Sequence, residues 1–190
     1  MNFLAHLYLS KRADDLMIGN FIGDAVKGNN FNNYSEGIAH GIIMHRSIDS
    51  YTDAHPVVHQ SKMRLVPRYK KYAGVLVDVF YDHFLASNWN QYHQTPLLEF
   101  ADKVYKLMQD NIQILPAKSR EMLPYMIKYN WLFNYSKIEG IKRTLTGMAN
   151  RTNFISNMEY ATEELEYFYD DFQKEFEMFF ADAIKQFKSY

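Results

Sequence analysis

Hydrophobic residues recur along this chain mostly at the spacing of an α-helix. In the C-terminal part, apolar positions follow one another at steps of three and four, which places them on one side of a helix. We therefore predict an amphipathic helix over 156–187 whose apolar stripe faces the core. The stripe consists of Ala161, Leu165, Phe168, Phe172, Phe176, Phe179, Ala183 and Phe187.

Boundary residues place several other helices. A helix over 35–54 is expected to end before Pro56, because proline disfavours a helical conformation in the residue that precedes it. Proline suits the first turn of a helix, so Pro96 is expected to open another one that extends to about Ile114. Further helices are predicted over 13–27, 72–88 and 136–149.

Two more prolines, Pro116 and Pro124, are expected to break the chain on either side of a short segment. The alternation typical of strands is hard to find over more than four residues. The chain also lacks internal repeats and linkers rich in Pro, Gly or Ser. We therefore predict one all-α domain over 1–190.

Composition supports a globular protein. The 190 residues are enough for one domain with a sizeable core, and 15 Tyr and 14 Phe supply large apolar side chains. The absence of Cys excludes disulfides and thiolate metal sites. The first residues do not resemble a signal peptide, and no apolar run is long enough to span a membrane. We therefore expect a soluble, cytoplasmic protein without a membrane partner.

Charged residues are unevenly distributed, although the net charge is only −1. Residues 159–177 hold eight acidic residues and one Lys, and we expect this run to be a solvated helix face. Residues 61–71 hold no acid, which suits either a solvated face or contact with an acidic partner. The basic residues of this run are Lys62, Arg64, Arg68, Lys70 and Lys71. Nucleic-acid binding is not expected, because no recognition motif is present.

An unusual combination of acidic and apolar residues occurs in DVFYDHF, residues 78–84. Asp78 and Asp82 are four residues apart, so they lie on one face of the predicted helix, with His83 beside them. The surrounding residues are apolar nearly all round, which is typical of a buried helix. Two buried carboxylates repel each other unless a cation offsets them, and a divalent ion or an Arg supplies that charge.

A second candidate stripe lies in MHRSIDSYTD, residues 44–53. His45 and Asp49 are again four residues apart, Asp53 continues the row, and Arg46 is adjacent. Alone, this pattern favours a hydrogen-bonded His and an Arg–Asp pair. Two such helices in one small domain favour a metal site.

The segment GNFIGDAVKG, residues 19–28, adds Asp24 and Lys27 to the candidates. Its glycines do not match a phosphate-binding fingerprint, so we expect them to permit close helix packing instead. His6 is a lone histidine in an apolar segment, and we interpret it as a core residue with satisfied hydrogen bonds. A role as a metal ligand is the less favoured alternative.

The chain has no GxSxG, catalytic Cys or HExxH motif. Hydrolysis would therefore need a water molecule that a metal activates. Asp and His ligands without Cys suit Mn²⁺ or Mg²⁺ better than structural zinc. From its residues alone, the protein is a candidate metal-dependent phosphoryl hydrolase of unknown substrate.

Five motifs together resemble the acyl carrier protein phosphodiesterases, also called acyl carrier protein hydrolases. They occur in the same order in this chain, from its first residue to about Arg151. The motifs are MNFLAHL, GNFIGDAVKG, MHRSID followed by Thr52-Asp53, DVFYDHFL and GMANR.

The resemblance implies hydrolysis of the phosphodiester that joins 4′-phosphopantetheine to a Ser of holo-acyl carrier protein. The products would be apo-acyl carrier protein and 4′-phosphopantetheine, and the reaction would need Mn²⁺ or Mg²⁺. The family is linked to the helical HD phosphohydrolases, which implies an HD-phosphohydrolase-like bundle. Those enzymes use a His-Asp dipeptide, whereas this chain has the reverse order, Asp82-His83. We therefore assign site residues by matched motif.

The matched motifs imply roles for specific residues. His83 would bind metal or act as the general acid for the leaving Ser oxygen. Arg46 or Lys27 would offset charge on the phosphodiester. Metal ligands, or residues that support them, would come from Asp24, His45, Asp49, Asp78 and Asp82.

Carrier proteins of this kind are small and acidic, which gives the basic run over 61–71 a docking role. Lys142, Arg143 and Arg151 form a second candidate patch. Two alternatives remain open at this point. One is an HD-like phosphohydrolase acting on nucleotides or other small phosphate esters, and the other is a non-enzymatic helical binding module.

Overall fold

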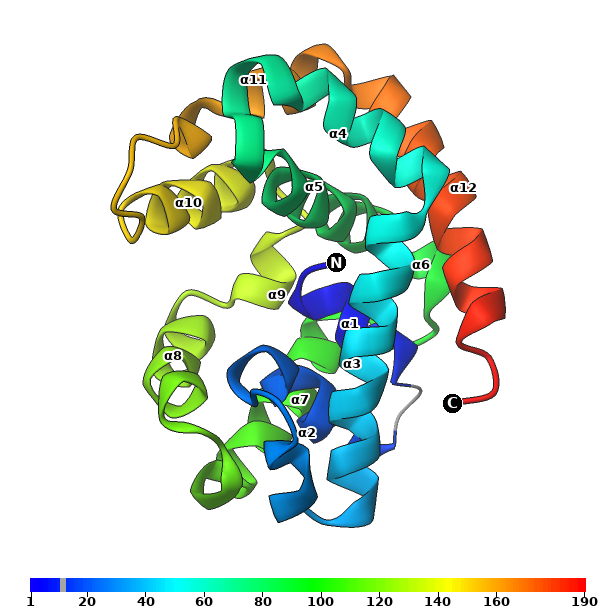
Figure 1. Cartoon of the computed structure of the whole chain (residues 1–190), viewed down its shortest axis with the longest axis vertical. Coiled ribbons are helices and arrows are strands. Elements are labelled where there is room, and N and C mark those ends of the chain that lie inside the picture. Colours follow the sequence, from blue (N-terminus) through cyan, green and yellow to red (C-terminus); the bar gives the residue numbers. More distant parts are fainter. Residues whose placement is uncertain (11–12) are drawn as a thin grey trace.

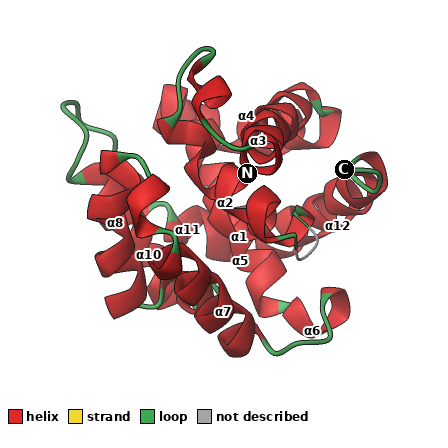
Figure 2. Cartoon of the chain, turned by 90° about the horizontal axis from the view of Figure 1, so that it is seen from below, coloured by secondary structure: helices red, strands yellow, loops and turns green. Residues whose placement is uncertain are grey.

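The computed structural model describes residues 1–10 and 13–190 as helices joined by loops and turns (Figures 1 and 2). Within these residues there is no β-strand, which confirms the all-α prediction. The α-helices are α1 (Phe3–Leu9), α2 (Asp14–Ile22), α3 (Glu36–Ala54), α4 (Pro56–Tyr69), α5 (Ala73–Ser87), α6 (Trp89–Tyr92), α7 (Leu97–Asp110), α8 (Ala117–Lys128), α9 (Trp131–Asn134), α10 (Ile138–Ala149), α11 (Thr162–Tyr167) and α12 (Tyr169–Gln186). The 3₁₀ helices are η1 (Gly23–Ala25), η2 (Asn30–Asn33), η3 (Lys70–Tyr72), η4 (Ile112–Ile114) and η5 (Met158–Tyr160). None of the described helices has the length and apolar character needed to cross a bilayer.

Helix α1 lies in the middle of the molecule, where it packs against α2 and α5 (Figure 1). Its residues Leu4, Ala5 and Leu7 are fully buried. The apolar pattern did not predict this helix, because a short and almost wholly apolar segment has no detectable periodicity.

Helices α2 and α3 approach each other closely at two glycines. A Cβ atom on Gly19 would lie 2.1 Å from the carbonyl oxygen of Ile38. A Cβ atom on Gly41 would lie 2.5 Å from the carbonyl oxygen of Leu16. Only glycine leaves room for backbones this close. The interpretation of the glycines in GNFIGDAVKG as packing residues is thus confirmed for Gly19.

The predicted C-terminal stripe faces the core, but the helix that carries it is not continuous. Phe172, Phe176 and Phe179 are fully buried, and the rings of Phe172 and Phe80 meet edge to face with centroids 5.3 Å apart. The predicted helix over 156–187 is divided into η5, α11 and α12, with Phe168 between the last two. Apolar spacing remains in phase across this interruption, so periodicity alone did not reveal it.

The prolines interrupt the chain less than expected. Helix α3 ends before Pro56, as predicted, and Pro56 is also the first residue of α4. Pro124 lies inside α8, so the expected break at this residue is wrong. Proline removes one backbone hydrogen bond from a helix, and burial of the neighbouring Leu123 and Met126 offsets that loss. Pro67 lies inside α4 in the same way.

The side chain of Asp82 on α5 caps the N-terminus of α1. Its two carboxylate oxygens accept hydrogen bonds from the backbone N–H groups of Leu4 at 2.7 Å and Ala5 at 3.1 Å. The first N–H groups of a helix have no partner within the helix, and burial makes an unpaired donor costly. Asp82 is fully buried, and burial raises its pKa to about 7, against the lowering effect of these two hydrogen bonds.

Substitution of Asp82 by Asn tests this role. The amide keeps the volume of the carboxylate but turns one acceptor into a donor, which then faces the N–H of Leu4 or Ala5. We expect Asp82→Asn to lower the free energy of unfolding by about 1–3 kcal/mol in urea denaturation followed by circular dichroism. Asp102→Asn, an exposed position on α7, is the matched control. Equal stability of the two variants would contradict the capping role.

Candidate functional site

Three side chains from two helices meet where α1 crosses α3. The Nε2 atom of His6 lies 3.1 Å from one carboxylate oxygen of Asp49, and the Nε2 atom of His45 lies 3.1 Å from the other. The two imidazole rings stack with centroids 4.1 Å apart. Both histidines are buried, whereas the side chain of Asp49 is 40% exposed. The three ligand-type atoms lie within 4.8 Å of one another, so this histidine–aspartate cluster opens to solvent on the side of Asp49.

Two further acidic side chains lie beside the cluster. The carboxylate of Asp24 is 3.5 Å from Nε2 of His45, and it is largely exposed at the rim. Asp78 is linked to the cluster by the amino group of Met1. This amino group lies 3.1 Å from the carboxylate of Asp78 and 3.7 Å from that of Asp49. This ammonium group is the cation that offsets Asp78. Burial lowers the pKa of the amino group, but the negative charges of Asp78 and Asp49 outweigh burial and raise it.

The cluster has an excess of acceptor atoms. Nε2 of His45 is buried and has no hydrogen-bond partner within the described residues, yet two carboxylates face it. Burial lowers the pKa of His45, but the carboxylates of Asp24 and Asp49 outweigh it and raise the pKa to about 9. Burial also raises the pKa of Asp49, but His45 and His6 lower it far more. The arrangement therefore favours a positive charge at its centre, either a proton or a metal ion.

The interpretation of His6 as a core residue with satisfied hydrogen bonds is confirmed, because the residue is buried and both ring nitrogens have partners. The structure also places it in the cluster. Burial lowers its pKa, so its ring is neutral at physiological pH. Its Nε2 faces not only Asp49 but also the carbonyl oxygen of Met1 at 3.1 Å. No sequence spacing links His6 to His45, because the two meet only through the packing of α1.

His83 lies outside this cluster. Its Nδ1 atom lies 2.8 Å from the carbonyl oxygen of Tyr135, and its Nε2 atom lies 3.1 Å from the hydroxyl of Tyr169. Both ring nitrogens thus have protein partners, which favours a structural role. Asp82 likewise has its partners in the backbone of α1. The cluster of ligand-type atoms includes neither residue.

Lys27 lies in the loop that follows η1, and Arg46 of α3 contacts this loop. The guanidinium of Arg46 donates to the carbonyl oxygens of Val26 at 2.9 Å and Gly28 at 2.8 Å, on either side of Lys27. It also lies 5.4 Å from the ring centroid of Phe31. Arg46 thereby fixes the loop, and the side chain of Lys27 is exposed.

Much of the predicted docking run is engaged within the protein. Arg64 donates to the buried Glu175 at 2.6 Å, and Arg68 pairs with Glu163 at 2.8 Å and Glu164 at 2.5 Å. The prediction that the acidic residues over 159–177 form a solvated face is therefore wrong for Glu175. Lys62 pairs with the exposed Asp53 at 2.6 Å.

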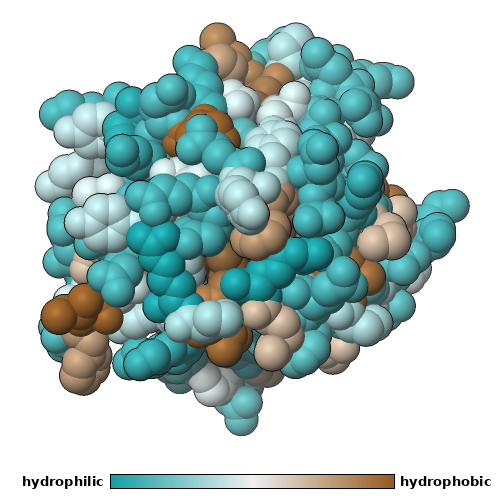
Figure 3. Space-filling view, turned by 90° about the horizontal axis from the view of Figure 1, so that it is seen from above, coloured by the Kyte–Doolittle hydropathy of each residue, from teal (hydrophilic) through white to brown (hydrophobic). Residues whose placement is uncertain are grey.

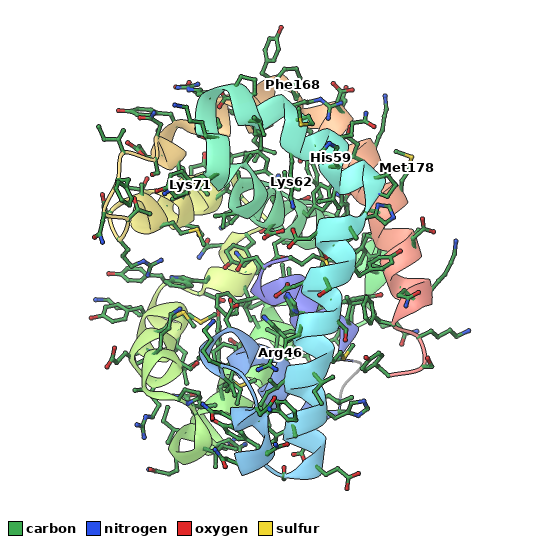
Figure 4. The ribbon with its side chains drawn as sticks, in the orientation of Figure 1. Arg46, His59, Lys62, Lys71, Phe168 and Met178 are labelled. Atoms are coloured by element: carbon green, nitrogen blue, oxygen red, sulfur yellow. The ribbon has the colours of Figure 1, made fainter. Side chains whose placement is uncertain are left out.

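Lys70 and Lys71 are exposed, and Lys71 lies 4.5 Å from the ring centroid of Phe154. Lys62 and Lys71 lie in the upper half of the molecule, while Arg46 lies in the lower half (Figure 4). Seen from above, the surface at the upper end is largely hydrophilic, with small scattered hydrophobic areas (Figure 3).

The fold and the cluster define a single-domain helical protein with a buried histidine–aspartate site that opens to solvent. The chain belongs to the acyl carrier protein phosphodiesterase family, whose sequence profile matches residues 1–183. This confirms the family predicted from the five motifs, and it makes the protein a hydrolytic enzyme of the phosphodiesterase class.

Relatives that carry the name acyl carrier protein phosphodiesterase match almost the whole chain. The protein from Photorhabdus laumondii is 34% identical over 95% of this chain and 91% of its own length. The protein from Yersinia enterocolitica is 32% identical over 98% of this chain and 97% of its own. The Enterobacter protein is 33% identical over 100% of this chain and 98% of its own. No solved structure matches the chain, so likeness to the HD phosphohydrolases stays a prediction.

Gly23 offers a test of how tightly the cluster is packed. A Cβ atom at this position would lie 2.3 Å from Cγ of His45, so Gly23→Ala should push the imidazole out of place. We expect a loss of about 1–3 kcal/mol in the free energy of unfolding, because the overpacked site is buried. The displaced ring should also change its NMR signals.

Gly147→Ala is the matched control, because a Cβ atom there meets nothing within 4 Å. That change in α10 should leave the histidine signals unaltered and should not destabilise the helix. Unchanged His45 signals in Gly23→Ala would show that the ring is not confined as described.

Proposed function

We propose that this enzyme hydrolyses the phosphodiester between 4′-phosphopantetheine and a Ser of holo-acyl carrier protein. The products are apo-acyl carrier protein and 4′-phosphopantetheine. The observation that carries this proposal is the meeting of His6, His45 and Asp49 at a partly open site in a chain that belongs to this family. Family membership favours an enzyme over the alternative of a binding module.

We also propose that the cluster holds Mn²⁺ or Mg²⁺. The Nε2 atom of His45 supports this, because it is buried facing two carboxylates without a hydrogen bond of good geometry to either. Imidazole and carboxylate ligands without thiolates suit such an ion. His6, His45 and Asp49 would hold it, with Asp24 at the rim. When bound, the ion supplies a Lewis acid for the phosphoryl group and activates a water molecule.

The surrounding residues have separate proposed roles. Lys27 offsets negative charge on the phosphodiester, and Arg46 keeps the loop of Lys27 in place through its two carbonyl contacts. Asp78 and Asp82 position α1, and thereby His6, through the Met1 amino group and the backbone of α1. A role of His83 in protonating the leaving oxygen stays a prediction, and its two ring contacts favour a structural role.

A groove at the start of α3 is a candidate site for an extended substrate arm. It has a volume of about 710 Å³, and its lining includes Ala25, the residue that follows Asp24 in the sequence. Amide and hydroxyl side chains alternate there with apolar ones, including Asn33, Tyr34 and Ile38. Such a lining suits the amide-containing pantetheine chain, which needs both hydrogen bonds and apolar contact.

The central experiment measures the intact mass of holo-acyl carrier protein after incubation with the enzyme and Mn²⁺. We expect loss of the phosphopantetheine arm, and we expect chelation to abolish that loss. His45→Gln and Asp49→Asn should each lower kcat/KM by at least about a hundredfold, because each removes a proposed ligand. Calorimetry should show weakened Mn²⁺ binding in both.

His59→Gln is the matched control. This exposed histidine of α4 lies far from Arg46, which follows His45 in the sequence (Figure 4). It should retain parental activity and Mn²⁺ affinity. Full turnover by either cluster variant would remove that residue from the proposed site. Turnover of nucleotides in place of the carrier protein would favour the alternative of an HD-like phosphohydrolase acting on small phosphate esters.

We further propose that basic residues near the end of α4 dock the acidic carrier protein. Arg64 and Arg68 already pair with acidic residues of α11 and α12, and Lys62 with Asp53, so Lys70 and Lys71 are the best placed for an external partner. We expect Lys70→Glu combined with Lys71→Glu to raise KM about three- to tenfold at low salt. The effect should shrink as salt screens the charges.

Lys174→Glu combined with Lys188→Glu makes the same change in net charge at other exposed positions. A docking role for Lys70 and Lys71 requires a larger KM in their variant than in this control. Equal KM values would leave only a general charge effect and would contradict local docking.

A further inference from the structure

Asn20 of α2 is buried beside the two stacked histidines of the cluster, with 1% of its surface exposed. Its side-chain oxygen lies 2.8 Å from Nδ1 of His6. Its main-chain oxygen lies 2.9 Å from Nδ1 of His45. One residue therefore contacts the inner nitrogen of both imidazoles, on the side away from Asp49.

The hydrogen-bond network settles which atom of Asn20 faces His6. The side-chain nitrogen donates to the carbonyl oxygen of His6 and to the hydroxyl of Ser10, both at 3.0 Å. The carbonyl can only accept, so the amide nitrogen must be on that side. The amide oxygen then faces Nδ1 of His6 at 2.8 Å, whereas the acceptors at Nε2 lie at 3.1 Å. The shorter contact favours the proton of the neutral ring on Nδ1.

The same reasoning applies to His45. The main-chain oxygen of Asn20 is an acceptor only, so Nδ1 of His45 carries a proton and donates it. With both Nδ1 atoms used as donors, the Nε2 atoms are the ones left to bind a cation, and both face Asp49.

We infer that Asn20 is a positioning residue that selects the tautomer of His6 and orients both imidazoles towards Asp49. The inference rests on the proposed function, because its purpose is to present Nε2 to a metal ion. Metal-binding histidines commonly donate their other ring N–H to an oxygen acceptor, and loss of that acceptor costs about 10–100-fold in metal affinity.

Loss of the Asn20 side chain has a specific consequence for His6. Without an acceptor at Nδ1, the proton is better placed on Nε2, where Asp49 and the Met1 carbonyl oxygen both lie at 3.1 Å. The ring would then present an N–H group, rather than a lone pair, to the centre of the cluster.

The test is NMR of the metal-free protein at neutral pH with ¹⁵N-labelled histidine, in which two-bond couplings identify the protonated ring nitrogen. The signal of His6 is assigned from a His6→Gln sample. We expect a proton on Nδ1 of His6 in the parent and on Nε2 in Asn20→Leu. Asn20→Asp keeps an oxygen opposite Nδ1 and should retain the parental tautomer. Asn20→Ala serves in place of Asn20→Leu if the latter does not fold.

Mn²⁺ affinity measured by calorimetry is the second readout. Asn20→Leu should weaken binding about 10–100-fold, and Asn20→Asp should bind Mn²⁺ more tightly than Asn20→Leu. Thr52→Val is the control, because it also removes a buried side-chain hydrogen bond, 2.8 Å long and within α3. It should change neither the tautomer nor the affinity.

An unchanged His6 tautomer in Asn20→Leu or Asn20→Ala would overturn the inference, as would the same tautomer shift in Thr52→Val. Lack of Mn²⁺ binding by the parent protein would contradict the proposed metal site instead. The tautomer comparison decides the role of Asn20 in either case, because it uses metal-free protein.

Discussion

The arrangement of the site depends on how the start of α1 is buried. The first N–H groups of a helix lack partners inside the helix, and water cannot reach them in the core. Asp82 accepts from two of them, and Asp78 pairs with the amino group of Met1. Both acids are on α5, four residues apart, so one face of α5 holds the beginning of α1 in place. His6 then follows at a fixed distance and meets α3.

Charge balance links this support to the cluster. Asp49 lies within reach of the Met1 amino group and of both imidazoles. Its carboxylate is therefore the point where the support of α1 and the histidine pair meet. Burial keeps the ring of His6 neutral, while Asp24 and Asp49 hold a positive charge on His45. A metal ion at the centre would replace that proton rather than add a charge to an empty site.

Helical periodicity predicted much of the fold but not its details. The core-facing stripe near the C-terminus is confirmed, because its apolar spacing is long and regular. The helix over 35–54 is confirmed from its boundary residues instead. The interruption at Phe168 and the continuation of α8 through Pro124 depend on tertiary packing, which outweighs local preference. Helix α1 has only seven residues, too few for a period to appear. It is also the element on which the site depends most.

Spacing predicted which acidic residues share a helix face, but it did not predict the partner of each. His45 and Asp49 do meet, as their separation of four residues requires. Asp78 and Asp82 also lie on one face, and the expected opposite charge is present for Asp78. For Asp82 the partner is the backbone of α1, and a backbone N–H group leaves no mark in a sequence. The acidic residues that look most out of place in the apolar helix α5 therefore support the site, whereas the inconspicuous His6 and Asn20 lie within it or against it.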